Sequence, residues 1–99
     1  MRVITGSARG RKLKELPGLD TRPTTDKVKE SIFNIIQFDI EGRRALDLFA
    51  GTGQLGIEAL SRGAAHCTFL ELRKEAAAVV RENLEHTKLA DRASVLQRD

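Results

Sequence analysis

A glycine-rich run in the middle of the chain and an acid beyond it are the residues whose types and spacing could do chemistry. The run Gly51-Thr52-Gly53-Gln54-Leu55-Gly56 has G-x-G-x-x-G spacing, and Glu71 follows its first glycine by twenty residues. Glycines allow a tight turn and close approach of the backbone to a ligand, and a carboxylate beyond the next strand can accept hydrogen bonds from two ribose hydroxyls. The spacing therefore predicts a site for a ligand that contains a nucleoside.

Asp47 separates the two cofactor classes that use such a loop, dinucleotides and S-adenosylmethionine. It stands four residues before Gly51, so we expect it near the mouth of the same crevice. A carboxylate there repels a pyrophosphate and attracts an ammonium or sulfonium group. Asp47 therefore favours S-adenosylmethionine, whose methionine end is cationic. Asp47 could also accept backbone N–H bonds of the glycine loop, and that role is compatible with ligand binding.

The elements that must position these residues alternate between short apolar strands and helices. The expected order is strand, helix, strand, helix, strand, at residues 45–49, 54–61, 67–70, 73–86 and 94–96. This βαβαβ order predicts an α/β fold with a parallel sheet and right-handed crossovers. Ligands of such folds bind at the carboxyl ends of the strands, where the glycine loop and Glu71 are expected.

An additional helix is expected before the first strand. Thr24, Thr25 and Asp26 are N-cap candidates that follow the break at Arg22-Pro23. Apolar residues then recur with helical spacing and predict a buried stripe, made of Val28, Ile32, Ile35 and Ile36. The charged residues expected to face water are Lys27, Lys29 and Glu30 in this helix and Glu58 in the next. Cys67 is expected in the core.

Positive charge is concentrated at the N-terminus. Lys and Arg outnumber Asp and Glu by 17 to 14, and the first fourteen residues hold five basic residues and no acid: Arg2, Arg9, Arg11, Lys12 and Lys14. Residues 1–16 are expected to form a β-hairpin around a glycine-bounded turn at residues 6–10. A cationic hairpin beside a nearly neutral body indicates contact with a polyanion such as RNA. The alternative is a solvated basic surface with no partner.

Composition restricts the class of protein. The chain has 99 residues, of which 40% are hydrophobic and 31% charged, so one soluble domain is expected, in the cytoplasm. No apolar run approaches the ~20 residues that a membrane-spanning helix needs, and no signal peptide is expected. A single cysteine excludes an internal disulfide, and no His or Cys spacing predicts a metal site.

These motifs together resemble a known family. The segment Asp47-Leu-Phe-Ala-Gly-Thr-Gly53 is similar to the first motif of class I methyltransferases. Residues 1–11 and 21–30, with Thr21-Arg-Pro-Thr24, resemble the bacterial 16S ribosomal RNA (guanine-N2)-methyltransferase family. The resemblance implies a Rossmann-like fold and methyl transfer from S-adenosylmethionine to a guanine amine of 16S rRNA, free or in the assembling small subunit.

The resemblance also implies roles for individual residues. The cofactor would be bound by the loop and the strand ends, namely by Asp47, Phe49, Gly51, Thr52, Gly53, Glu71, Leu72 and Asp99. Arg22 and Thr24 would close over the methionine end, or would serve only as helix entry and cap. The hairpin residues Arg2, Arg9, Arg11, Lys12 and Lys14 would contact RNA phosphates.

The family's catalytic tetrapeptide, Asp/Asn-Pro-Pro-aromatic, does not occur in the sequence, whose prolines are Pro17 and Pro23. We therefore expect the chain to be the N-terminal part of a methyltransferase, with a hairpin at 1–16, a truncated half of the cofactor domain at 17–99, and no activity alone. The strand that bears Asp47 would have an exposed edge through which the chain self-associates. Two other classes stay open: a non-catalytic RNA-binding fragment and a dinucleotide-dependent oxidoreductase.

Overall fold

The predicted order of helices and strands is confirmed. The computed structural model describes residues 2–16, 23–48 and 50–98, and the side chains of 23–26 lie outside that description. The elements are α1 (Pro23–Ile36), β1 (Arg44–Leu48), α2 (Gln54–Ser61), β2 (His66–Leu70), α3 (Lys74–His86), a 3-10 turn (Ala90–Arg92) and β3 (Ala93–Leu96). In these ranges, no helix has the length and apolar character needed to cross a membrane.

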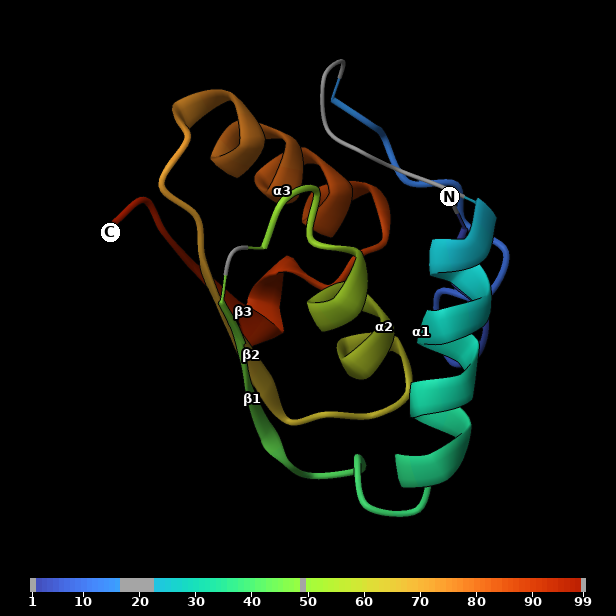
Figure 1. Cartoon of the computed structure of the whole chain (residues 1–99). Coiled ribbons are helices and arrows are strands. Elements are labelled where there is room, and N and C mark those ends of the chain that lie inside the picture. The colour runs from blue at the N-terminus through green and yellow to red at the C-terminus, as the bar shows by residue number, and fades with distance from the viewer. Residues whose placement is uncertain (1, 17–22, 49, 99) are drawn as a thin grey trace.

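The sheet is parallel, as expected, with the order β1-β2-β3. Asp47 of β1 is in register with Phe69 of β2, and Phe69 is in register with Val95 of β3. Figure 1 shows α2 and α3 on one side of this sheet, with α1 beyond α2. The carboxyl ends of all three strands therefore lie along one edge, on which the loops before α2 and α3 open.

The core lies between the sheet and the helices α2 and α3, and it continues to the N-terminal segment and α1 through Val3, Leu13 and Phe33. It includes fully buried residues from both layers: Ile57, Leu60, Cys67, Phe69 and Val80. Gly56 lies where α2 crosses β2, and a Cβ at this position would overlap the ring of Phe69. The last glycine of the motif is therefore required for close helix-to-sheet packing. Cys67 is a core residue, as expected, and burial raises the pKa of its thiol to about 12, with the charge of Asp47 adding to the shift.

The expected burial of α1 is wrong. The stripe of Val28, Ile32, Ile35 and Ile36 is exposed, and Ile35 is 80% accessible. The helix instead turns Lys29 and Phe33, which are four residues apart, toward the interior. A cation replaces an apolar residue on the buried face because α2 supplies a buried carboxylate opposite it, so hydropathy alone selected the wrong face.

That carboxylate is Glu58, which was expected in solvent and is instead 0% exposed. Its Oε1 lies 3.4 Å from Nζ of Lys29, and its Oε2 accepts a 2.9 Å bond from Nε of Arg62. The same two oxygens accept the backbone N–H groups of Ile4 and Thr5, at 2.9 and 3.1 Å. Glu58 is tolerated in the interior because two cations and two backbone donors surround it.

The N-terminal segment reverses direction like a hairpin but does not form two paired strands. It contains a single antiparallel bridge, Arg2 with Lys12. The backbone donors that a longer ladder would use are bound by α2: Ile4 and Thr5 by Glu58, Ala8 by Oγ of Ser61 at 3.0 Å. The N–H of Ser7 donates to the carbonyl of Ser61 at 2.8 Å. We refer to residues 2–14 as the N-terminal hairpin in this restricted sense.

Candidate cofactor site

The cofactor loop, residues 50–53, turns sharply between β1 and α2. Gly51 and Gly53 both have positive φ angles, 60° and 85°. The N–H of Ala50 donates to the carbonyl of Leu70 at 3.0 Å, and the N–H of Gly53 donates back to Ala50 at 2.8 Å. The loop is therefore held against the end of β2. The helix α2 begins directly after the loop, and the N–H of Gly56 in its first turn is bound by Asp47.

Glu71 follows β2 directly, at the strand end where it is expected, and it contacts the loop. Its Oε1 accepts the N–H of Gly51 at 2.9 Å, and its Oε2 accepts the N–H of Arg73 at 2.8 Å. The guanidinium of Arg73 adds two longer bonds, at 3.2 and 3.3 Å. Burial alone raises the pKa of Glu71, but the bonds from Arg73 and Gly51 together outweigh it and leave the pKa below its ordinary value. Glu71 is therefore an oriented, ionised acceptor.

Asp47 also contacts the loop region, on the side of α2. Its Oδ2 accepts the N–H of Gly56 at 3.1 Å, which confirms that it can serve as a backbone acceptor. Burial raises the pKa of Asp47, the bond from Gly56 opposes this shift, and the nearby charge of Glu71 adds to it. The two carboxylates, from neighbouring strand ends, thus lie near enough for the charge of Glu71 to act on Asp47, and a positive charge close to both would relieve this repulsion.

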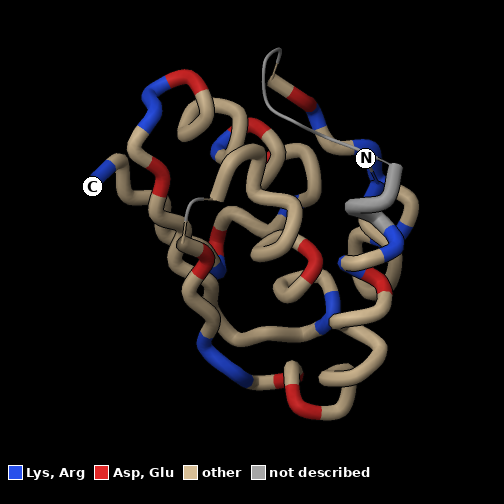
Figure 2. Tube along the Cα trace, viewed as in Figure 1, with Lys and Arg blue, Asp and Glu red and all other residues tan. Residues whose placement is uncertain are grey.

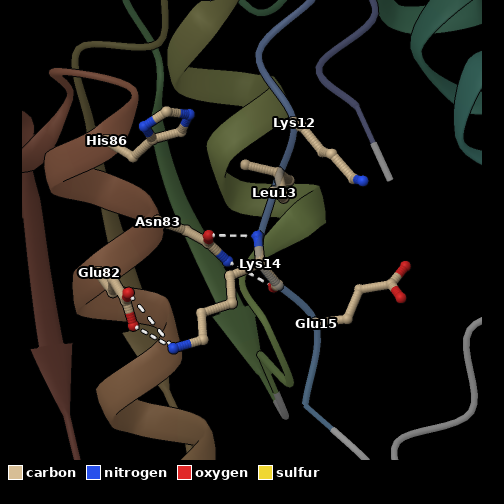
Figure 3. Close-up of a pocket in the computed structure, with 7 residues that line it drawn as sticks. All are labelled: Lys12, Leu13, Lys14, Glu15, Glu82, Asn83 and His86. Atoms are coloured by element: carbon tan, nitrogen blue, oxygen red, sulfur yellow. Dashed lines mark hydrogen bonds and ion pairs between the residues drawn. The ribbon is translucent and has the colours of Figure 1, made fainter.

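Thr52 is buried within the cofactor loop and its carbonyl is held from α3. Nδ2 of Asn83 donates to this carbonyl at 3.0 Å. The amide of Asn83 also pairs with the backbone of Lys14, since Oδ1 accepts the N–H at 2.7 Å and Nδ2 donates to the C=O at 3.0 Å. Figure 3 shows the two Asn83–Lys14 bonds. One side chain therefore joins the loop, α3 and the N-terminal hairpin.

Other predicted cofactor residues are only partly described. Leu72, which follows Glu71, is 58% exposed. Thr24 lies in the first turn of α1, but its side chain is outside the described part. Phe49, Arg22 and Asp99 lie outside the described residues altogether. In the ranges that are described, no group of three His, Cys, Asp or Glu residues could hold a metal ion.

The five basic residues of the N-terminal hairpin are all exposed. Figure 2 shows this cationic stretch near the start of α1. Arg2 donates to the carbonyl of Gly10 at 3.3 Å, and Lys14 forms an exposed ion pair of 3.0 Å with Glu82. A pocket of about 410 Å³ lies between the hairpin and α3 (Figure 3), lined by Lys12, Leu13, Lys14, Glu15, Glu82, Asn83 and His86.

Sequence reasoning missed Asn83 and the buried pair of Glu58 and Lys29. A signal existed for Asn83, which lies three residues after Val80 and therefore on the inward face of α3. Glu58 lies between Ile57 and Ala59 in the apolar middle of α2, a position that also indicates burial. Asn83 and Glu58 both form hydrogen bonds with segments that are remote in sequence, and residue spacing within one helix does not reveal such partners.

Comparison with known proteins agrees with this architecture. Residues 1–99 match the family model described as Conserved hypothetical protein 95. Among curated proteins, YlbH of Bacillus subtilis is 56% identical over 99 residues, covering 100% of this chain and 54% of that protein. Ribosomal RNA small subunit methyltransferase D of Haemophilus influenzae is 49% identical over 88 residues, covering 89% of this chain and 46% of that protein. The chain thus spans about half the length of the curated relatives it matches.

A solved structure supports the fold directly. The structure of the putative methyltransferase yhhF from Escherichia coli matches this chain with a TM-score of 0.90 and 43% sequence identity. The match covers 100% of this chain and 53% of that chain. The expected Rossmann-like class I methyltransferase fold, of which this chain spans about half, is thereby confirmed. By the match along its whole length, this chain belongs to the family described as Conserved hypothetical protein 95.

Proposed function

We propose that the chain is the cofactor-binding part of a methyltransferase that uses S-adenosylmethionine to modify ribosomal RNA. One observation carries the proposal: Glu71 and Asp47, from adjacent strand ends, each accept a backbone N–H of the glycine motif, at Gly51 and Gly56. The arrangement presents two carboxylates and a close-approach loop to one ligand. A methyl donor with a ribose and a cationic amino-acid end satisfies both carboxylates, whereas a pyrophosphate is repelled.

The residues present fit that cofactor. Glu71 would accept the ribose hydroxyls after exchanging its two guanidinium bonds, and the half-exposed Arg73 side chain is free to swing into water. The backbone bonds from Gly51 and Arg73 would keep the carboxylate in place. Asp47 would face the ammonium or sulfonium end. Oε1 of Gln54, at the start of α2, is buried without a partner among the described groups and adds an acceptor near the loop. When bound, the cofactor supplies the activated methyl group.

The N-terminal hairpin supports RNA as the substrate. Its exposed lysines and arginines match a phosphate backbone, and the Haemophilus influenzae relative is named a ribosomal RNA small subunit methyltransferase. We propose that the parent enzyme methylates the exocyclic N2 of a guanine in 16S rRNA and that it acts in the cytoplasm. No catalytic residue is assigned here, because the sequence contains no Pro-Pro tetrapeptide to hold the target amine. The chain alone is therefore expected to bind without transferring methyl.

Calorimetry tests the cofactor assignment. Titration of the chain with S-adenosylhomocysteine and, separately, with NAD should give binding for the first ligand only. Saturable binding of NAD alone would favour a dinucleotide enzyme. If the chain binds neither S-adenosylhomocysteine nor NAD, binding of 16S rRNA that falls steeply with salt would favour the non-catalytic RNA-binding fragment. Incubation of 16S rRNA with methyl-labelled S-adenosylmethionine should leave the RNA unlabelled by the chain and labelled by a full-length relative.

We also propose that this chain self-associates through β1. Within the described sheet, β1 pairs only with β2, so its other edge is open. The strand carries exposed Leu46 and Leu48, and Ile35 of α1 and Phe38 in the turn after it are also exposed. Such an apolar edge favours pairing with another chain. Sedimentation should show a concentration-dependent mass, whereas a monomer at all concentrations would refute this proposal.

A further inference from the structure

Asn83 lies where the two proposed binding segments meet. It is 1% exposed, and its amide oxygen and amide nitrogen are both engaged. The nitrogen is shared between the carbonyls of Thr52 in the cofactor loop and Lys14 in the N-terminal hairpin, both at 3.0 Å. A buried amide that uses both of its polar atoms is held in one orientation. A shift of either carbonyl therefore disturbs the bond to the other.

Each carbonyl belongs to a segment that a ligand would order. Thr52 lies between Gly51 and Gly53, which permit the turn by which the loop approaches the cofactor. Lys14 has its backbone pinned by Asn83, while its ammonium reaches solvent and pairs with Glu82, both side chains being more than half exposed. A phosphate that draws the Lys14 ammonium away from Glu82 acts on the residue whose backbone Asn83 holds. The two ligands thus act on opposite sides of one amide.

We propose that Asn83 is a positioning residue that couples RNA binding at the N-terminal hairpin to cofactor binding at the loop. The inference rests on the proposed function. A bound cofactor fixes the Thr52 carbonyl, hence the Asn83 amide and the Lys14 backbone. The end of the hairpin at Lys14 is then already ordered when RNA binds, so RNA binding costs the hairpin less conformational entropy. Because such coupling is reciprocal, RNA strengthens cofactor binding by the same factor.

Two affinity ratios measure this coupling. The Kd of the chain for transcribed 16S rRNA is measured with and without saturating S-adenosylhomocysteine, and the Kd for S-adenosylhomocysteine with and without RNA. We expect both ratios to be about five-fold or more in the unmodified chain. The Asn83→Ala variant should bring both ratios to one. A matched control is Asn34→Ala, which makes the same change at an exposed position of α1 and should keep both ratios.

A merely structural role would lower stability and weaken both ligands in Asn83→Ala, but it would leave the ratios unchanged. Hydrogen exchange in the unmodified chain provides a readout that survives if the variant does not fold. The N–H of Lys14, bonded to Oδ1 of Asn83, should exchange several-fold more slowly when S-adenosylhomocysteine is bound. If S-adenosylhomocysteine binds while the Lys14 exchange rate and both ratios stay unchanged, the coupling is refuted and the proposed function stands. If S-adenosylhomocysteine does not bind, the proposed function fails, and the coupling fails with it.

Discussion

Glu58 beneath the N-terminal hairpin and Asp47 beside the cofactor loop are both carboxylates withdrawn from water, but protein groups neutralise them differently. Glu58 contacts two cations, Lys29 and Arg62, and accepts two backbone N–H groups. Within the described part of the chain, Asp47 accepts one bond, from Gly56. A carboxylate whose acceptor positions are filled stabilises structure, whereas one with unused capacity can receive a ligand.

Glu71 combines features of both. Its backbone bonds from Gly51 and Arg73 resemble those that hold Glu58, since they fix the carboxylate in place. Its bonds to the Arg73 guanidinium come from a side chain that is 53% exposed, so replacing them with bonds to a ligand costs little free energy. Glu58 is therefore an anchor that holds the N-terminal hairpin on α2, whereas Asp47 and Glu71 form the candidate cofactor site.

The largest effect should come from removing the anchor. Glu58→Ala leaves the Lys29 ammonium, 1% exposed, without its carboxylate, and releases the backbone donors of Ile4 and Thr5. Loss of one partner of a buried pair costs about 3–5 kcal/mol, to be measured by urea unfolding. The exposed Glu85→Ala on α3 is the control, expected to stay within about 0.5 kcal/mol. Equal stability of the two variants would mean that Glu58 is not an anchor.

Two glycines of the N-terminal hairpin provide a second test of the anchor. Both Gly6 and Gly10 have positive φ, so alanine at Gly10 should cost about 1 kcal/mol of backbone strain. A Cβ at Gly6 would in addition overlap the backbone carbonyl of Ser61 in α2, whereas a Cβ at Gly10 meets nothing. Gly6→Ala should therefore be less stable than Gly10→Ala by about 1–3 kcal/mol in thermal unfolding. Similar losses would show that the hairpin is not docked on α2.

Substitutions in the candidate cofactor site should lower the affinity for the cofactor rather than the stability of the fold. Asp47→Asn keeps an acceptor for the N–H of Gly56 and removes a charge whose burial raises its pKa, so the fold should be maintained. The loss of a charge-assisted contact corresponds to about 1.5–3 kcal/mol, or roughly ten-fold or more weaker binding of S-adenosylmethionine by calorimetry. The exposed Asp91→Asn serves as control. An unchanged affinity in Asp47→Asn would remove Asp47 from the site.

The smallest effect concerns pH. Bonds from Arg73 and Gly51 lower the pKa of Glu71, so this group stabilises the fold above its ordinary pKa, and the stabilisation is lost as pH falls through the lowered value. Arg73→Gln should raise the pKa of Glu71 and flatten the acid limb of stability by a fraction of a kcal/mol, because Arg73 is half exposed. Urea midpoints across the acid range measure this, with Arg81→Gln as control. Identical acid limbs for the unmodified chain and Arg73→Gln would contradict the assigned cause.

Local patterns were sufficient to predict the strands, the helices and the cofactor loop. Asp47 and Glu71 stand near the ends of two consecutive strands, and parallel strands align their carboxyl ends, so the sequence predicts that these two residues lie near each other. The inward face of α1 was not predictable in the same way. Lys29 is buried because Glu58, remote in sequence, lies opposite, and hydropathy counts such a lysine as exposed.

The N-terminal hairpin shows the same limit. Its alternation and glycine-bounded turn predict a ladder of backbone bonds between two strands. In the structure, side chains of α2 accept several of those N–H groups, at Glu58 and Ser61, and only one bridge forms. Asn83 is a parallel case on α3, since its partners Lys14 and Thr52 lie in two other segments. Predictions from one segment fail where a second segment completes the hydrogen bonding.

The most direct test of the central claim is calorimetric titration of this chain with S-adenosylhomocysteine, alongside its Glu71→Gln and Glu58→Gln variants. Glu71→Gln should bind at least about ten-fold more weakly, because a ribose acceptor has been lost. Glu58→Gln should bind with nearly the original affinity wherever it stays folded, and should be clearly less stable. Equal affinity of Glu71→Gln and the unmodified chain, or no binding by the unmodified chain, would contradict the account.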